Sequence, residues 1–133
     1  MPKAAVSSEA EKSKLIGNDL FARGKYSAAI EAYTEARLCS PKWEVPLVNR
    51  ALCYKKQGKW DKVAEDCVAA LQLGSELPKA EYMLGLSFLE RGDYKSAETH
   101  LQKALDLARN KGATMLDDIW KELARAKYAL WTA

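Results

Sequence analysis

Four polar side chains in three successive segments could bind an anion: Lys14, Asn18, Asn49 and Lys79. Lys14 and Asn18 are four residues apart, so a helix would place them on one face, one turn from each other. Ammonium and amide groups both donate hydrogen bonds, and those that reach a charged acceptor are the stronger ones. This set predicts a site for a ligand that carries carboxylates, and a free C-terminus would add a second carboxylate at the last residue.

Apolar side chains share the predicted helix faces with these polar residues. They are Phe21 in the first segment, Val45 and Leu52 in the second, and Tyr82 and Met83 in the third. A cationic surface with small apolar pockets suits an extended peptide that has carboxylates and one or two apolar side chains. We therefore expect a peptide as the ligand.

The other reactive residues form no catalytic or metal-binding pattern. The single histidine, His100, has no partner at ligand spacing, and the Asp117–Asp118 pair has no nucleophile motif beside it. Three cysteines stand at no metal-ligand spacing, so we expect buried thiols in a reducing compartment: Cys39, Cys53 and Cys67. The sequence predicts no metal, no cofactor and no enzymatic activity in this chain.

Charge and hydropathy argue against two further classes of partner. The net charge is +3, from 21 basic and 18 acidic residues among 133, which is too balanced for a nucleic-acid-binding domain. No apolar run approaches the ~20 residues of a membrane span, and the N-terminus lacks the apolar core of a secretory signal. We expect neither nucleic acid nor membrane as a partner, and we expect the cytoplasm, with the nucleus as a second location.

The elements that would position these residues repeat every 34 residues. Turn glycines recur at this step at Gly24, Gly58 and Gly92, each followed two residues later by an aromatic residue. Small residues that would permit close helix crossing recur as well: Gly17, Ala51 and Gly85. This period and pattern are those of the tetratricopeptide repeat. The predicted fold is all-α, with three helix-turn-helix units over 10–43, 44–77 and 78–111 in a right-handed superhelical array.

Helix boundaries follow from the repeat. The predicted pairs are 9–22 with 26–39, 44–57 with 60–73, and 78–91 with 94–109. Ser8 begins a capping-box pattern for the first helix. Residues 1–9 would form a disordered tail and the helix start, with disorder over 1–7. A closing helix over 115–132, within a capping segment 112–133, would cover the apolar face of the last unit.

Three segments resemble the carboxylate-clamp class of tetratricopeptide co-chaperones. They are K-S-K-L-I-G-N-D-L-F (12–21), N-R-A-L-C-Y (49–54) and K-A-E-Y-M-L-G (79–85). Domains of this class bind the C-terminal Glu-Glu-Val-Asp tails of the seventy- and ninety-kilodalton heat-shock chaperones. Two further segments, L-Q-K-A-L-D-L-A-R (101–109) and D-D-I-W (117–120), are similar to the subgroup that carries a U-box ubiquitin ligase domain. The resemblance covers about residues 10–133.

The resemblance implies a role for each matching position. Its carboxylate clamp matches Lys14, Asn18, Asn49, Lys79 and Asp118. Its apolar pocket matches Phe21, Val45, Leu52, Tyr82 and Met115. Met83 stands where many clamp domains have an arginine, a departure that the U-box subgroup shares. Two alternatives stay open: Phe21, Leu52 and Tyr82 could belong to the core, and Asp118 could oppose the helix dipole.

The resemblance implies a binding module that targets chaperone-bound substrates within a ubiquitin ligase of protein quality control. The sequence contains no U-box, so we expect either an excised domain or a truncated relative. We expect this chain to be monomeric, from a parent protein that is a monomer or a dimer. Two other functions remain as alternatives. One is the clamp domain of a different co-chaperone, such as an adaptor or the helper domain of a prolyl isomerase or phosphatase. The other is a scaffold that binds an internal peptide.

Overall fold

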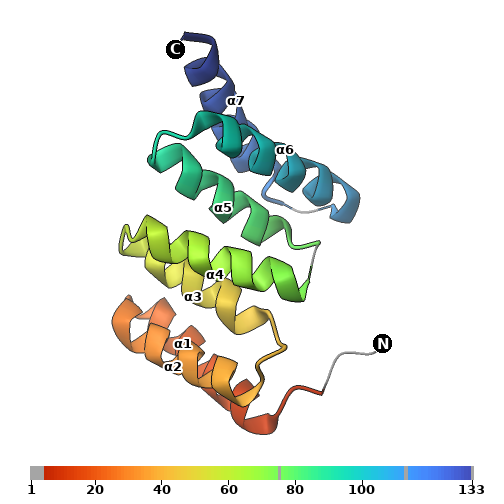
Figure 1. The fold of residues 1–133 in the computed structure, drawn as a ribbon. Coiled ribbons are helices and arrows are strands. Elements are labelled where there is room, and N and C mark those ends of the chain that lie inside the picture. The colour runs from red at the N-terminus through yellow and green to blue at the C-terminus, as the bar shows by residue number, and fades with distance from the viewer. Residues whose placement is uncertain (1–4, 75, 113, 133) are drawn as a thin grey trace. The chain divides into compact units, whose positions relative to one another are not determined.

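The computed structural model describes residues 5–74, 76–112 and 114–132. Over these ranges the chain forms helices and no strand (Figure 1). The helices are α1 (Ser8–Ala22), α2 (Tyr26–Cys39), α3 (Val45–Lys56), α4 (Trp60–Leu73), α5 (Pro78–Glu90), α6 (Tyr94–Lys111) and α7 (Leu116–Thr132). The all-α prediction is confirmed, and every helix end lies within two residues of its predicted position. No helix in the described ranges is long and apolar enough to cross a membrane.

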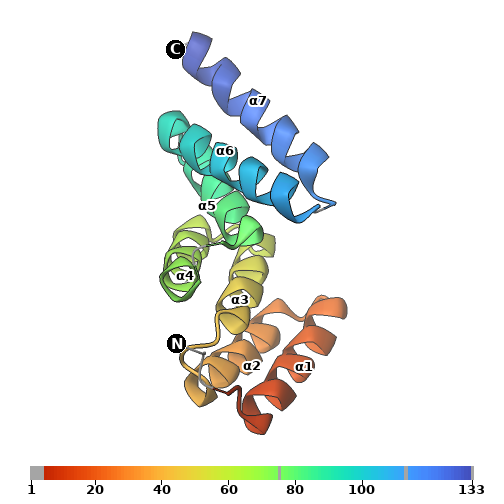
Figure 2. The same cartoon turned by 90° about the vertical axis from the view of Figure 1, so that its right-hand side faces the viewer.

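The chain divides into two compact units, one on each side of residue 75. In the first unit, α2 packs against both α1 and α3, and α3 packs against α4. In the second unit, α6 packs against both α5 and α7, and α5 also touches α7. Figures 1 and 2 show these neighbours within each unit.

Two glycines permit the close helix crossings that the repeat predicts. A Cβ atom on Gly17 of α1 would lie 2.5 Å from Cε1 of Tyr33 on α2. A Cβ atom on Gly85 of α5 would lie 2.7 Å from Cγ of Leu101 on α6. Both distances are far shorter than a van der Waals contact, so any side chain at either glycine would overpack the crossing.

The turn glycines between paired helices are also as predicted. Gly24, Gly58 and Gly92 have φ values of 75°, 72° and 80°. A residue with a Cβ atom rarely adopts this left-handed conformation, which glycine reaches without steric cost. Glycine at this step in each unit therefore reverses the chain between its two helices.

The cap of α1 differs from the prediction by one residue. Ser7 caps the helix in place of Ser8: the Ala10 amide donates a hydrogen bond to the Ser7 hydroxyl at 3.1 Å. The Ser7 amide in turn donates to Oγ of Ser40 at 3.0 Å, a contact across 33 residues that sequence spacing does not reveal. Ser7 is therefore anchored, in contrast to the disorder expected for residues 1–7, of which 1–4 lie outside the described residues.

The cysteines follow the prediction in two cases out of three. Cys53 and Cys67 are buried, whereas Cys39 is exposed. Cys39 is the last residue of α2, where the helix leaves the core, so the expectation of a buried thiol is wrong for it. No group of three or more His, Cys, Asp and Glu residues in the described ranges could hold a metal ion.

Candidate functional site

Lys14 is held by two neighbours in the first unit. Its Nζ atom lies 3.4 Å from Oε2 of Glu11, one turn earlier on α1. The same Nζ atom lies 5.3 Å from the ring centroid of Trp43, in the connection between α2 and α3. The Lys14 side chain is 24% exposed, so a ligand can still reach the ammonium group.

Asn18 lies one turn after Lys14 and is exposed. Its Oδ1 atom accepts a hydrogen bond from the Tyr33 hydroxyl of α2 at 2.6 Å. Tyr33 is 3% exposed, and burial, with a smaller effect from the Cys53 thiol, raises its pKa to about 12. The hydroxyl therefore stays protonated near neutral pH and can act as the donor.

The remaining first-unit candidates are half-buried. They are Phe21 on α1 and Val45, Asn49 and Leu52 on α3. Phe21 packs against the core cluster formed by Ala29, Tyr33 and Cys53. Its ring also meets the Tyr26 ring edge-on, with centroids 5.4 Å apart. Phe21 therefore contributes to the core and keeps only part of its surface for a ligand.

In the second unit, the candidate residues come from α5 and from the start of α7. Lys79 is exposed in the first turn of α5, and Tyr82 is half-buried on the same helix. Burial raises the pKa of Tyr82 above its ordinary value, and the negative charges of Glu122 and Asp118 on α7 raise it further. Tyr82 and Asp118 therefore lie within electrostatic range of each other.

The two methionine candidates differ in exposure. Met115, just before α7, is half-buried. Met83 is 4% exposed, so it offers a ligand very little surface in the free protein. The roles of all these candidate residues stay predictions.

The structure contains two buried polar networks that the sequence analysis did not predict. In the first unit, Arg50 on α3 donates to both carboxylate oxygens of Asp66 on α4, at 2.8 and 2.6 Å. Arg50 also donates to the Thr34 hydroxyl of α2 at 3.0 Å. The carboxylate is almost fully buried, with Asp66 5% exposed. This bidentate pair therefore links three helices of the unit.

The second network surrounds a buried carboxylate on α5. Glu81 is 2% exposed. Its Oε2 atom lies 2.8 Å from Nδ1 of His100, and its Oε1 atom lies 3.2 Å from Nζ of Lys103. The sequence contained a signal for this network. Glu81 occupies the repeat position that holds Leu47 in the preceding unit, and a carboxylate at a core position needs a partner.

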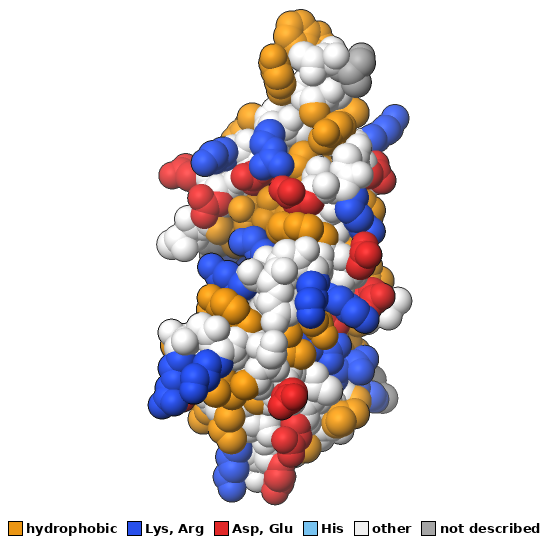
Figure 3. Space-filling model, turned by 90° about the vertical axis from the view of Figure 1, so that its left-hand side faces the viewer, with side chains coloured by type: hydrophobic (Ala, Val, Ile, Leu, Met, Phe, Trp, Pro, Cys, Tyr) orange, Lys and Arg blue, Asp and Glu red, His pale blue; other side chains and the backbone are white. Residues whose placement is uncertain are grey.

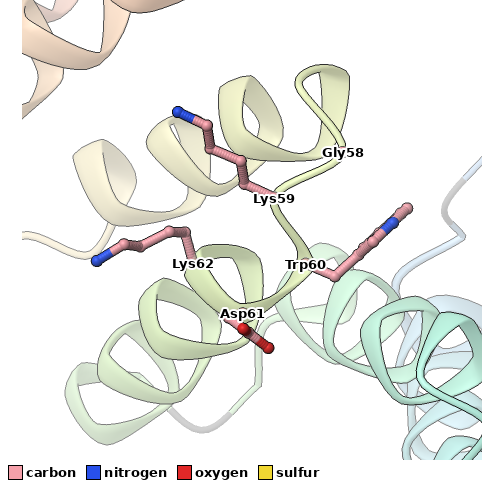
Figure 4. A pocket seen from close by; sticks show the side chains of 5 residues that line it. All are labelled: Gly58, Lys59, Trp60, Asp61 and Lys62. Atoms are coloured by element: carbon pink, nitrogen blue, oxygen red, sulfur yellow. The ribbon is translucent and has the colours of Figure 1, made fainter.

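A pocket opens at the turn between α3 and α4, lined by Gly58, Lys59, Trp60, Asp61 and Lys62 (Figure 4). The two lysine side chains extend to one side, whereas Trp60 and Asp61 point in other directions. No candidate residue from the sequence analysis lines this pocket. On the face drawn in Figure 3, Lys and Arg side chains are interspersed with acidic and hydrophobic ones.

Comparison with known proteins identifies the family. Residues 78–111 match a profile described as the tetratricopeptide repeat. The Sgt2 tetratricopeptide domain from Aspergillus fumigatus, known from a crystal structure, is 32% identical in sequence to this chain. The two structures match with a TM-score of 0.85 over 98% of this chain and 85% of that one. The chain belongs to the tetratricopeptide-repeat family. The predicted all-α tetratricopeptide fold is thus confirmed.

Two further relatives confirm the resemblance to co-chaperones. The E3 ubiquitin-protein ligase CHIP of Arabidopsis thaliana is 44% identical over 98% of this chain, which spans 48% of that protein. The first tetratricopeptide domain of Spaghetti (RPAP3), solved with the HSP90 peptide SRMEEVD, is 28% identical. Its TM-score is 0.85, over 93% of this chain and 94% of that one.

Proposed function

We propose that this chain is a co-chaperone module that binds the C-terminal Glu-Glu-Val-Asp tails of the seventy- and ninety-kilodalton heat-shock chaperones. The observation that carries the proposal is the pair of donors on α1. Lys14 and Asn18 stand one turn apart and both have N–H groups that a ligand can reach. A similar domain, the first of RPAP3, was solved with a peptide of this kind.

In this proposal, Lys14, Asn18, Asn49 and Lys79 donate to the carboxylates of the tail. Each charge-assisted hydrogen bond is worth about 1.5–3 kcal/mol. Phe21, Val45, Leu52, Tyr82, Met83 and Met115 contact the apolar side chains of the tail. Contact with Met83 requires that binding uncover this residue, because it is 4% exposed in the free protein. Asp118 also contacts the peptide, beside Tyr82.

The parent protein is, in this proposal, a ubiquitin ligase of the CHIP type that acts in cytoplasmic protein quality control. The support is the 44% identity with the Arabidopsis ligase over 98% of this chain. The three units at 10–43, 44–77 and 78–111 and the segment 112–133 supply chaperone binding, and the ligase activity belongs to other parts of the parent.

Titration calorimetry with the peptide SRMEEVD tests the proposed function. Lys14→Ala and Lys79→Ala should each weaken binding by about tenfold or more. Helical circular dichroism should stay unchanged, because neither side chain is part of the core. Lys95→Ala is the matched control: Lys95 is an exposed lysine in the first turn of α6, and its loss should leave the affinity unchanged.

The same peptide with a C-terminal amide separates this proposal from the scaffold alternative. The amide removes the charge at the last residue, so a carboxylate clamp should bind it much more weakly. Equal affinity for acid and amide, together with unchanged affinity in both lysine variants, would overturn the proposal and favour a scaffold for internal peptides.

A further inference from the structure

We infer that Tyr33 is a positioning residue that fixes the amide of Asn18, so that the site binds a carboxylate and rejects a neutral amide. The inference rests on the proposed function and deepens it. It arises from the 2.6 Å hydrogen bond between the Tyr33 hydroxyl and Oδ1 of Asn18. Tyr33 does not need to touch the ligand, because it acts through Asn18.

The orientation of the Asn18 amide follows from the needs of the buried hydroxyl. In the described part of the chain, Asn18 is the only hydrogen-bond partner of the Tyr33 hydroxyl. If the amide were flipped, Nδ2 would donate to the hydroxyl oxygen and the O–H proton of Tyr33 would have no acceptor. A buried donor without an acceptor is costly, and at 3% exposure Tyr33 has almost no access to water. Oδ1 therefore points to Tyr33, and the two N–H groups of Nδ2 point away from it.

The hydroxyl can reach Asn18 because Gly17 leaves room for the ring. A Cβ atom on Gly17 would lie 2.5 Å from Cε1 of Tyr33 and 2.9 Å from its Cζ atom. The ring thus lies directly against the backbone of α1, one residue before Asn18. The packing that holds the ring also sets the position of the hydroxyl.

The fold itself does not require this polar pair. In the third repeat, Leu86 and Leu101 occupy the positions that correspond to Asn18 and Tyr33. Leu101 packs against Gly85 as Tyr33 packs against Gly17, and it is fully buried. An apolar pair therefore serves the same helix crossing. Leu86 is buried whereas Asn18 is exposed, so the comparison bears on the second position of the pair: the helix crossing does not need the Tyr33 hydroxyl, and orienting the N–H groups of Asn18 is the candidate for its use.

Fixing the amide makes the site selective. Two outward N–H donors suit the oxygens of a carboxylate, which only accept hydrogen bonds. A C-terminal amide has one oxygen that can accept from these donors, but its NH2 group only donates and cannot take the place of the second carboxylate oxygen. If Asn18 were free to flip, its Oδ1 atom could accept from the peptide amide, and this discrimination would decline.

Tyr33→Phe tests the inference because it keeps the ring against Gly17 and removes only the hydroxyl. Calorimetric titration with SRMEEVD as the free acid and as the C-terminal amide gives the ratio of the two dissociation constants. We expect this ratio to fall by about threefold or more in Tyr33→Phe, the range for loss of one hydrogen bond. Tyr26→Phe is the control, since Tyr26 lies on the same helix and makes no hydrogen bond with Asn18. Its ratio should equal that of the unaltered protein.

A ligand-free measurement keeps this inference separate from the proposed function. Nuclear magnetic resonance of the Asn18 side-chain amide should show a changed shift in Tyr33→Phe and not in Tyr26→Phe. If the unaltered protein fails to bind the peptide, the proposed function fails while the resonance still tests the hydrogen bond. An unchanged ratio or an unchanged Asn18 resonance in a folded Tyr33→Phe would overturn the inference. If Tyr33→Phe does not fold, the test is made on the unaltered protein, by detecting the Tyr33 hydroxyl proton next to Asn18 in the resonance spectrum. Absence of this proton signal would overturn the inference.

Discussion

Glu11 should compete with the peptide for Lys14, so Glu11→Gln should strengthen tail binding. In the free protein the Lys14 Nζ atom lies 3.4 Å from Oε2 of Glu11, with the two side chains 24% and 49% exposed. A carboxylate of the tail must share the Lys14 ammonium group with Glu11 or displace Glu11 from it. Exposed ion pairs of this spacing are worth ~0.3–1 kcal/mol, so their loss in the free state should tighten binding about twofold to fivefold.

Calorimetric titration of Glu11→Gln with SRMEEVD measures this change, and Glu9→Gln is the matched control. Both glutamates lie in the first turn of α1, so each substitution removes one negative charge near the helix N-terminus. The two variants should lose a similar amount of stability, about 0.3–1 kcal/mol, from the weaker interaction with the helix dipole. Glu9 is not paired with Lys14, because the contact of its Oε2 atom is with the Ser8 hydroxyl at 3.4 Å.

The comparison has two outcomes that would refute the reasoning. Equal tightening in Glu11→Gln and Glu9→Gln would show that net charge matters and that the ion pair does not. Weaker binding in Glu11→Gln alone would show that Glu11 holds Lys14 in its binding position. The expected result is tightening in Glu11→Gln only, and it should shrink as salt is added, since salt screens exposed charges.

Three further predictions concern stability. Gly85→Leu should lower the free energy of unfolding by ~1–3 kcal/mol or more through overpacking, while Lys95→Leu should change it by less than ~0.5 kcal/mol. If thermal melts show Lys95→Leu to be the less stable variant, the assignment of Gly85 to the helix-crossing position of the repeat is wrong. Lys103→Ala should lower the free energy of unfolding, measured in urea, by ~1–3 kcal/mol. The reason is that Glu81, which is 2% exposed, then keeps one partner in place of two. A change as small as that in Lys95→Ala would show that Lys103 contributes nothing to stability. Burial raises the pKa of Tyr33 from 10.0 to about 12, so the unfolded state loses this proton first and stability should fall between pH 10 and 12 by ~2–3 kcal/mol. Unfolding curves across this range should show a smaller fall in Tyr33→Phe, and an equal fall would refute the assignment.

The helices could be predicted from the sequence because each repeat position has a strict physical requirement. Gly24, Gly58 and Gly92 all have positive φ, which few residues other than glycine tolerate. Gly17 and Gly85 leave no room for a Cβ atom. These requirements recur every 34 residues, so each unit confirms the register of the next.

Contacts between distant side chains were not predictable in the same way. The Ser7 amide meets Oγ of Ser40, and Trp43 lies against the Lys14 ammonium group. Both contacts join α1 to the connection after α2, whose path follows from tertiary packing and not from periodicity.

The repeats provide an internal comparison that separates the needs of the fold from those of function. At one pair of equivalent positions the chain has Asn18 with Tyr33 in the first repeat and Leu86 with Leu101 in the third. Leu101 is fully buried at the position of Tyr33, so packing at this helix crossing does not require a hydroxyl group. The Tyr33 hydroxyl instead donates to Asn18. Asn18 is exposed and stands one turn from Lys14, so a ligand that binds Lys14 can also reach the residue that Tyr33 positions.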